Sequence, residues 1–493
     1  MTKHFYRTAV VLFAVINVVL ANENSYESVS IGNYNIKFSL SGDIYSLHVS
    51  YPQKNAPPKT AHFYGIQGKP LIELKTSENT FIDSCMRTAG VIFSKTDNDS
   101  AVIISFRSNI LKSNTYLEKI YTFRKTNYLS NISIKFSGDY THNLQKEFTL
   151  VVNCSENEHD KYHYVSINKR KNRVSNIKPD TKDTLTDFMW GGKRDRFWTM
   201  LFTTGSSSPA YFGKDQLSIN LKSDDKNGYT VSMYSGPIVF KELQAAGSEC
   251  SRLLYPLWFW MRWLSIGLLI IFNKLLELTN NVVVSLVLLS ITVKIIISPF
   301  FRIANKWQEQ VNRQTSILQP RLTEIKTKYK GEEQTKQTLA LYKELGISPL
   351  YSLKSLLSAA IQIPIFFAAY HMLSEHIALS GISFLWIADL SHSDNFLQLP
   401  FTLPYFGNHL NILPFVMTSV TIASSWLHKD HSLSAALQRK QQTNLYFMAG
   451  LFFILLYTSP AGMVIYWTMN NILAFLSTLF EQKFSKKQIL KTI

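Results

Sequence analysis

The stretch VVVSLVLLSITVKIIISPFF, residues 282–301, decides the fold of this chain. As an α-helix its 20 residues span about 30 Å, which is the thickness of the hydrocarbon core of a bilayer. Lys294 lies near the middle, where a charge costs about 2.5–3.5 kcal/mol. A carboxylate partner or water must offset that cost. Neither this run nor the later apolar runs carry a central Asp or Glu, so we expect water to solvate Lys294.

The composition separates the chain into two parts. The whole chain has 493 residues and a formal net charge of +17. Residues 22–250 are polar with short alternating apolar stretches, whereas residues 255–482 carry nearly all the long apolar runs. This pattern predicts one soluble domain followed by a membrane domain. The basic residues collect in loops beside apolar runs, so membrane topology explains them better than nucleic-acid binding does.

Residues 1–21 have the form of an export signal. Lys3 and Arg7 precede the apolar stretch Thr8–Ala21, as in secretory signals. The segment is predicted either as a cleaved signal or as an N-terminal anchor span. In both cases residues 22–250 are delivered across the membrane.

The three cysteines, Cys85, Cys154 and Cys250, form no CxxC motif, and no histidine cluster has metal-ligand spacing. We therefore expect no cofactor, no zinc site and no disulfide scaffold. A Cys85–Cys154 bridge is left open, because an exported domain would permit it.

Residues 28–245 are predicted to be rich in β-strands. Residues 34–40 alternate in hydrophobicity, and Ser41-Gly42-Asp43 supplies a turn. Similar short strands are expected at 29–31, 102–106, 129–136 and 230–234. Several such strands favour an all-β sandwich.

The apolar half is predicted to hold one interfacial helix and five spans. Residues 255–278 carry three tryptophans and several charges, which is typical of an amphipathic helix lying in the outer interface. The five-span core, residues 279–482, has its spans at about 281–302, 353–374, 410–427, 443–458 and 461–482.

The charges of the connecting loops predict the topology. From Arg302 to Lys354 there are ten Lys or Arg against five Glu, whereas residues 375–409 contain neither Lys nor Arg. Loops 303–352 and 428–442 and the basic tail 483–493 are therefore expected in the cytoplasm. Residues 375–409, the turn at 459–462 and the β-rich domain are expected outside.

The cytoplasmic segment is predicted to be a helical hairpin. Its first arm carries an apolar stripe of Ile303, Trp307, Val311, Leu318, Leu322, Ile325 and Tyr329. A second helix is expected from Glu332 to Leu345. Two roles stay open: the arms bury their stripes against each other, or the hairpin is a mobile arm that docks clients or partners.

The position of Lys294 predicts a hydrated recess. It lies twelve residues from the outer end of its span and eight from the inner end, about 18 Å and 12 Å, which is too far for comfortable snorkelling. We place its ammonium in the inner-leaflet half of a recess open to the cytoplasm. Polar residues of the spans could line it or join helices by hydrogen bonds; they are Ser290, Ser358, Gln362, Thr418, Ser424, Asn470 and Asn471.

A series of short motifs points to a family. They are, in chain order, SGDI at 41–44, YSGP at 234–237, QP at 319–320, SP at 348–349, QIPIFFAAY at 362–370, LWIADLS at 385–391, SPAG at 459–462, YW at 466–467 and NN at 470–471. In order and topology this series resembles the YidC family of membrane-protein insertases, of the Gram-negative bacterial type with a large periplasmic domain. The resemblance covers essentially the whole chain.

The resemblance implies a site and partners. It implies five spans around a hydrophilic groove open to the cytoplasm and laterally to lipid, a galactose-mutarotase-like sandwich in the periplasm, and an inner-membrane location. Its partners would be nascent membrane-protein clients and the Sec translocon. Most members carry an arginine in the groove, and Lys294 takes that position here, which keeps the charge but loses the bidentate fork. Residues 350–354 also lack the glycines usual before the third span.

The predicted function is membrane-protein insertion, with no enzymatic chemistry. Lys294 would attract acidic residues of a client's translocating tail while the client's apolar segment enters the lipid. The basic tail 483–493 and the cytoplasmic loops could contact ribosomal RNA, since polyanions attract basic runs, or could act only as topogenic charge.

Two other functions are the alternatives to insertion. A transporter or channel with an intramembrane lysine would need a continuous polar path, but the outer halves of the spans (282–289 and 410–416) are apolar. A membrane-tethered sugar enzyme would need a histidine and a carboxylate in one cleft. Glu158, His159 and His163 are close in sequence, but their surroundings are typical of a polar loop.

Overall fold

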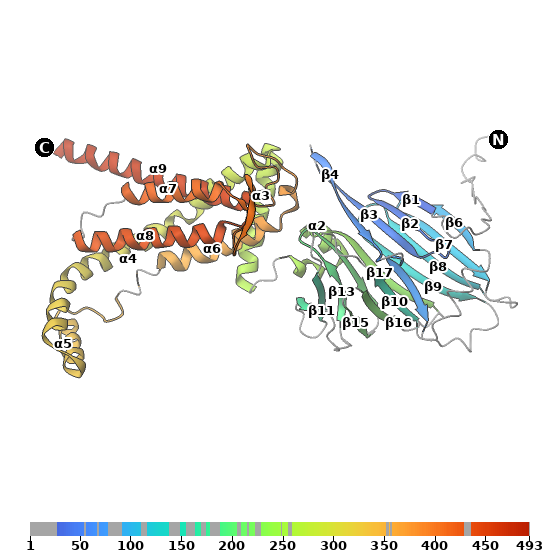
Figure 1. The fold of residues 1–493 in the computed structure, drawn as a ribbon, viewed down its shortest axis with the longest axis horizontal. Helices are drawn as coiled ribbons and strands as arrows, with labels where there is room; N and C mark the ends of the chain where they lie inside the picture. Colours follow the sequence, from blue (N-terminus) through green and yellow to red (C-terminus); the bar gives the residue numbers. More distant parts are fainter. Residues whose placement is uncertain are drawn as a thin grey trace, which may run out of the picture. The chain divides into compact units, whose positions relative to one another are not determined.

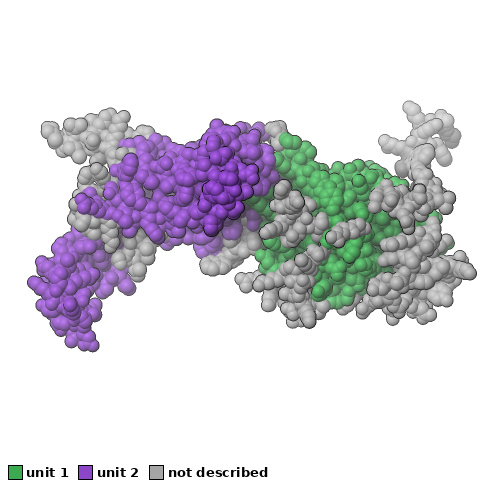
Figure 2. Space-filling model, viewed as in Figure 1, with its two compact units in different colours: residues 1–256 green, residues 257–493 purple. Residues whose placement is uncertain are grey.

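The chain divides into two compact units, residues 1–256 and 257–493, which are coloured separately in Figure 2. The predicted signal or anchor (1–21) and two of the cysteines, Cys85 and Cys154, lie outside the residues that the structure describes. The structure is a computed structural model, and it describes residues 27–53, 56–66, 69–76, 91–109, 116–137, 148–153, 163–168, 174–177, 188–204, 209–213, 216–221, 228–247, 249–254, 259–351, 354, 357–427 and 435–492.

Unit 1 consists mainly of two antiparallel sheets (Figure 1). One sheet has the order β1-β2-β3-β5-β10-β16-β15, with β4 also paired to β3, and the other has the order β12-β11-β13-β14-β17-β9-β8-β7-β6. The strands of the first sheet are β1 (Glu27–Ile31), β2 (Tyr34–Phe38), β3 (Ile44–Gln53), β4 (Ala56–Tyr64), β5 (Ile72–Thr76), β10 (Phe148–Asn153), β15 (Ala210–Phe212) and β16 (Gln216–Leu221). Those of the second are β6 (Ile92–Asp97), β7 (Ala101–Asn109), β8 (Tyr116–Arg124), β9 (Leu129–Ser137), β11 (His163–Asn168), β12 (Val174–Ile177), β13 (Phe188–Arg194), β14 (Trp198–Thr203) and β17 (Gly228–Pro237).

The two sheets pack face to face through the alternating apolar residues that the sequence shows. In β2, Tyr34, Ile36 and Phe38 are buried while the residues between them are exposed, as the two-residue period of a strand requires. The ring of Phe38 lies 5.2 Å from that of Phe106 in β7 on the other sheet. The prediction of an all-β sandwich in this part of the chain is confirmed. A short helix, α2 (Phe240–Ala246), and the 3-10 helix η1 (Cys250–Leu253) end the unit.

Unit 2 is helical (Figure 1). Its helices are α3 (Phe259–Thr279), α4 (Val282–Lys328), α5 (Gly331–Glu344), α6 (Leu357–Ser374), α7 (Leu413–Leu427), α8 (Ala435–Leu456) and α9 (Ala461–Thr492). Each of the predicted spans lies within one of these helices or overlaps it. The stretch predicted as an interfacial helix corresponds to α3, which begins at Phe259 in the described residues, and Trp260 and Trp263 are both exposed on it.

The first predicted span and the first arm of the hairpin form one continuous helix, α4. Neither Pro299 nor Pro320 terminates this helix. The predicted boundary between span and hairpin, near residue 302, is therefore the expected edge of the membrane and not the end of a helix. The second arm, α5, begins one residue earlier and ends one residue earlier than predicted.

The two arms of the predicted hairpin, the C-terminal part of α4 and α5, pack against each other. Leu318, Leu341 and Ile347 form its buried core. The predicted stripe is wrong in its first two residues and in its last: Val311 and Leu318 are buried, but Ile303, Trp307 and Tyr329 are exposed. Leu318, Leu322 and Ile325 are the residues of the stripe that pack in this core.

One helix in the described part of the chain, α4, is long and apolar enough by itself to cross a membrane. Shorter apolar helical stretches lie at Ala360–Ser374, Leu413–Trp426 and Gln442–Leu456. The segment between α6 and α7 also holds structure that the sequence did not predict. It contains a short 3-10 helix, η3 (Ile377–Leu379), and a hairpin of β18 (Leu397–Leu403) and β19 (Gly407–Leu410).

Candidate functional site

The candidate site lies in the helical unit, in which α4 carries Lys294. Helix α4 contacts α3, α6 and α9, and α7 contacts both α8 and α9. The side chain of Ser265 on α3 donates a hydrogen bond to the carbonyl oxygen of Ala368 on α6 at 3.2 Å. These contacts bring four helices that carry predicted groove residues into one bundle.

Lys294 lies at the margin of the buried face of α4. Ser290, one helical turn before it, is fully buried, and so is Leu286, one further turn away. Lys294 is half-buried, whereas the next residue, Ile295, has 66% of its surface exposed. The helical period therefore directs Lys294 along the packed side of α4 and Ile295 away from it.

Three of the predicted groove residues bond within their own helices. Ser290 donates to the carbonyl oxygen of Val287 at 2.7 Å, Thr418 donates to that of Pro414 at 2.8 Å, and Asn470 donates to that of Tyr466 at 3.0 Å. These bonds satisfy one donor of each side chain in an apolar setting, where an unsatisfied donor is costly.

Asn471 behaves differently, since it joins two helices. Its amide nitrogen donates to Thr421 Oγ1 on α7 at 2.8 Å. Thr421 was not among the predicted site residues, although it lies one helical turn from Thr418. Gln362 and Ser424 are half-buried, and the side chain of Ser358 lies outside the described residues.

A cluster of aromatic rings links α6, α8 and α9 beside these polar residues. The ring of Phe366 lies 4.8 Å from that of Trp467 and 5.3 Å from that of Phe452, and the last two rings are stacked at 4.9 Å. Phe366 and Trp467 both belong to the family motifs, but the sequence does not predict that they pack together. Such clusters fix the spacing of helices that also carry polar side chains.

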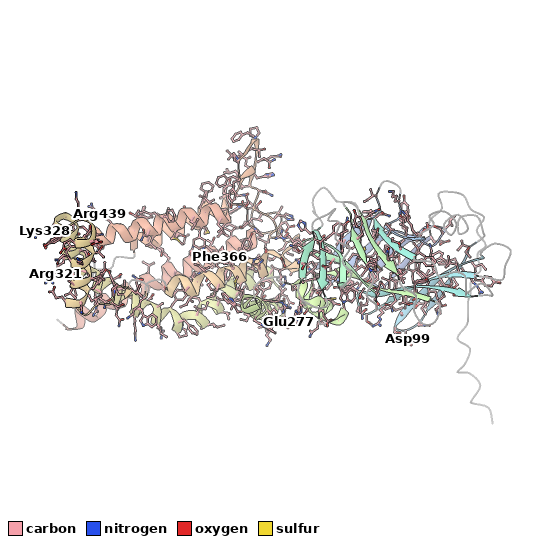
Figure 3. All side chains as sticks on the ribbon, turned by 90° about the horizontal axis from the view of Figure 1, so that it is seen from below. Asp99, Glu277, Arg321, Lys328, Phe366 and Arg439 are labelled. Carbon is pink, nitrogen blue, oxygen red and sulfur yellow. The ribbon has the colours of Figure 1, made fainter. Side chains whose placement is uncertain are left out.

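Basic residues gather at one end of unit 2. Figure 3 shows Arg321, Lys328 and Arg439 near one end of this unit and Glu277 near the other, with Phe366 between them. Arg321 also pairs with Glu344 across the hairpin at 2.8 Å. Arg321, Lys328 and Arg439 therefore lie at the end of the unit that is opposite to Glu277 (Figure 3).

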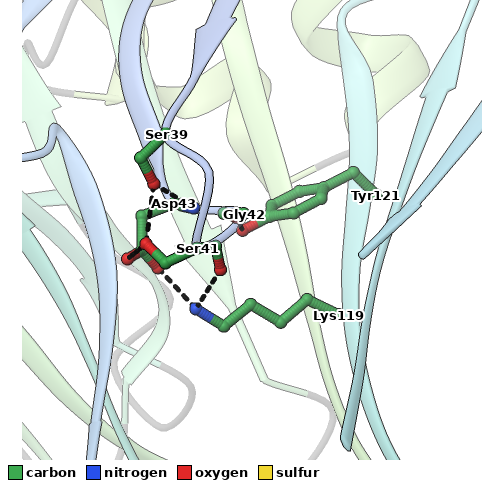
Figure 4. A network of polar contacts seen from close by, with 6 residues as sticks. All are labelled: Ser39, Ser41, Gly42, Asp43, Lys119 and Tyr121. Carbon is green, nitrogen blue, oxygen red and sulfur yellow. Dashed lines mark hydrogen bonds and ion pairs between the residues drawn. The ribbon is translucent and has the colours of Figure 1, made fainter. Parts of the chain in front are cut away.

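The SGDI motif of unit 1 forms a buried polar network (Figure 4). Lys119 Nζ lies 2.6 Å from Asp43 Oδ1 and 3.3 Å from the carbonyl oxygen of Ser41, and Tyr121 donates to the carbonyl oxygen of Gly42 at 2.6 Å. Gly42 has a φ of +76°, and a Cβ there would lie 2.6 Å from the Phe106 ring. The motif therefore holds a tight turn against the opposite sheet, which is a structural role.

Of the residues considered for a sugar enzyme, His163 lies exposed on β11. Glu158 and His159 lie outside the described residues. Within the residues that the structure describes, no three His, Cys, Asp or Glu side chains gather as metal ligands would.

Comparison with known proteins identifies relatives. The family described as "60Kd inner membrane protein" matches residues 274–488. The membrane protein insertase YidC of Amoebophilus asiaticus is 24% identical over 422 residues, which are 79% of this chain and 69% of that protein.

Two solved structures are similar at low scores. A crystal structure of an active YidC insertase with its first transmembrane domain resolved has 19% identity and a TM-score of 0.36, with 94% of each chain covered. An Escherichia coli protein described as a putative aldose 1-epimerase has 7% identity and a TM-score of 0.27, with 43% of this chain and 98% of that one covered. Because both scores are low, the assignment of a family depends on the sequence matches.

Proposed function

The chain belongs to the YidC family of membrane-protein insertases, and from this premise we propose that it inserts proteins through a hydrated groove charged by Lys294. The matched family is described as an inner membrane protein, so the site of action is that membrane. The observation that carries the proposal is the half-buried lysine on the packed side of a helix long and apolar enough to span a bilayer.

We propose five spans around this groove, within α4, α6, α7, α8 and α9, with the exported β unit of the galactose-mutarotase type. The short apolar helices α6, α7 and α8 support this arrangement, and so does the gathering of Arg321, Lys328 and Arg439 at one end of unit 2 (Figure 3). That end would face the cytoplasm, as the distribution of basic loops favours.

The residues of the groove would shorten the part of the bilayer that a client's polar segment has to cross without water. Lys294 would attract acidic groups of the client, and the hydroxyl and amide groups of Ser290, Gln362 and Asn471 would offer hydrogen bonds to water. Water that reaches the cation would offset the cost of a charge in a dry bilayer, which is about 2.5–3.5 kcal/mol. A recess wetted from the cytoplasm leaves roughly the outer half of the bilayer to be crossed.

The driving force would be the client's own burial in lipid. Apolar surface removed from water contributes about 25 cal/mol per Å². The membrane potential adds about 2.3 kcal/mol per charge per 100 mV for acidic tails that cross outward. Insertion therefore needs no nucleotide or covalent chemistry from this chain.

Lys294 stands where most of the family has an arginine, and this difference bears on how the groove would act. Its ammonium is a point charge, whereas a guanidinium binds a carboxylate through two parallel hydrogen bonds. If the groove acts by charge and hydration, Lys294→Arg changes insertion little. The Sec translocon and the ribosome belong to the proposal as partners through the family resemblance and the basic tail.

The test is reconstitution of the full chain in liposomes with a small acidic-tailed client, scored by protease protection. Lys294→Glu is expected to abolish protection of the client, and Lys294→Arg to preserve it. Lys306→Glu is the matched control, because Lys306 is an exposed lysine on the same helix beyond the predicted span. Normal insertion by Lys294→Glu would refute the role of the groove charge.

A further inference from the structure

The hairpin of β18 and β19 leaves large apolar side chains exposed. Leu397, Phe401 and Tyr405 have 53%, 57% and 62% of their surface exposed. Such a ribbon has only two strands, and an isolated two-stranded hairpin is at best marginally stable in water. We therefore expect a partner to cover its apolar side chains.

The strand sequence indicates one apolar and one polar face. In β18, Leu397, Leu399, Phe401 and Leu403 alternate with Gln398, Pro400 and Thr402. Gln398 lies opposite His409 and Leu397 lies opposite Leu410, and the pairing shifts its register between Gln398 and Leu403. Alternation of this kind is typical of a strand with one face covered and the other in water.

The base of the hairpin is held rigidly. Asp394 Oδ2 accepts a hydrogen bond from the backbone N–H of Leu413, the first residue of α7, at 2.6 Å. Asn411 accepts from the N–H of Asn395 at 2.9 Å and donates to the carbonyl oxygen of Tyr457 at 2.7 Å. Both side chains are buried, so the ribbon keeps a fixed position at the end of α7.

The apolar surface of the hairpin continues onto α7. Phe415 and Val416, in the first turn of that helix, are exposed, and Phe406 of the hairpin turn packs on Tyr457 at 4.7 Å between ring centroids. No Asp, Glu, Lys or Arg occurs from Asn395 to His428. A protein interface also holds aromatic residues, with a polar rim that includes Arg, whereas a long aromatic-rich stretch with no charge at all is typical of the membrane interface.

We propose that the β18–β19 hairpin is an interfacial anchor whose apolar side chains enter the outer leaflet of the lipid bilayer. This inference rests on the proposed function, because it takes the N-terminal end of α7 to lie at the outer surface. The anchor holds that end of the helix bundle at a fixed depth, while Gln398 and Thr402 stay at the headgroups.

Spin labels on the full chain in lipid nanodiscs test the anchor. A nitroxide is attached to Phe401→Cys, in a background with Cys85→Ser, Cys154→Ser and Cys250→Ala. Collisions with oxygen, which concentrates in lipid, are compared with collisions with a water-soluble nickel chelate. Gln398→Cys is the matched control on the same strand, and Phe447→Cys, on the exposed side of α8, reports whether the helices themselves contact lipid.

The expected result is an excess of oxygen over nickel collisions at 401 and at 447, and the reverse at 398. If 447 reports lipid while 401 reports water, the anchor is refuted and the proposed span arrangement survives. If 401 is shielded from both reagents, protein covers the hairpin and the anchor is likewise refuted. If 447 also reports water, the span arrangement fails together with the anchor.

Discussion

The amide nitrogen of Asn471 on α9 lies 2.8 Å from Thr421 Oγ1 on α7, to which it donates a hydrogen bond. The preceding residue, Asn470, donates instead to the carbonyl oxygen of Tyr466 in its own helix. Two neighbouring asparagines, indistinguishable in the sequence, therefore make bonds of different kinds.

This difference predicts unequal effects of two alanine substitutions. Asn471→Ala removes a bond between helices and is expected to lower the free energy of unfolding by about 0.6–1.7 kcal/mol. Asn470→Ala is expected to change it by a few tenths at most, since its bond lies within one helix. Detergent-induced unfolding followed by circular dichroism measures both, and equal losses would contradict the assignment.

The buried pair of Lys119 and Asp43 is expected to be strongly coupled. Its side chains are only 2% and 10% exposed, and removing one partner leaves a buried charge, which costs about 3–5 kcal/mol. Lys119→Met and Asp43→Leu should each destabilise the β unit by that amount, and the double variant should lose much less than the sum. Urea unfolding of the natural protein, the two single variants and the double variant gives the four free energies of unfolding that this comparison needs. Additive losses would show that the pair is not coupled.

Acidification is expected to weaken the junction between α3 and η3 through His376. Its Nε2 lies 3.1 Å from Asn273 Oδ1, and its Nδ1 accepts from the N–H of Ala378 at 3.2 Å. Burial lowers the pKa of His376 to about 4. Between pH 6.5 and 4 the unfolded chain binds a proton that the folded chain does not, so stability is complete above pH 6.5 and falls as the pH drops towards 4.

The size of this effect is set by the pKa shift. One pKa unit corresponds to about 1.4 kcal/mol, and because His376 is half-buried we expect about 2 kcal/mol to be lost across the window. His376→Gln keeps a polar side chain that does not titrate. Melting temperatures measured from pH 7 to pH 4 should fall less steeply in this variant than in the natural protein, and parallel curves would rule out His376 as the cause.

The hairpin of α4 and α5 offers a matched pair of adjacent residues. Leu318 is fully buried between the arms, whereas 57% of Ile317 is exposed. Leu318→Ala is expected to destabilise the packing of the arms by about 2–5 kcal/mol, and Ile317→Ala to leave it nearly unchanged. Limited proteolysis of membrane vesicles, with cleavage scored between residues 303 and 352, should be faster only in the first variant. Equal cleavage rates would favour a mobile arm over a packed hairpin.

Individual strands and helices could be predicted from the sequence because each depends on a pattern of hydrophobic residues that are close together in the chain. Alternation at Tyr34, Ile36 and Phe38 predicted β2, and the apolar runs predicted where helices would lie. Chain contacts over long distances could not be predicted in the same way. Lys119 and Asp43 are 76 residues apart, and nothing in either neighbourhood indicates the other.

Two differences between the prediction and the structure, in the apolar stripe of α4 and in the β18–β19 hairpin, have physical explanations. The stripe from Ile303 to Tyr329 has helical spacing along its length, but spacing does not reveal how much of a face the shorter α5 can cover. The β18–β19 hairpin did have a signal, the alternation of residues 397–403 before a turn that ends at Gly407 with a φ of +78°. Pro400 and Pro404 obscured it, since proline usually argues against a strand.

The accessibility of position 294 to water tests the central claim most directly. Lys294→Cys and its neighbour Ile295→Cys are compared in a background without the native cysteines, by labelling membrane vesicles of known orientation with a membrane-impermeant maleimide. The account predicts rapid labelling at 294 from the cytoplasmic side, and little labelling at 294 from the outside or at 295 from either side. A cysteine at 294 that stays unlabelled from the cytoplasm would contradict it.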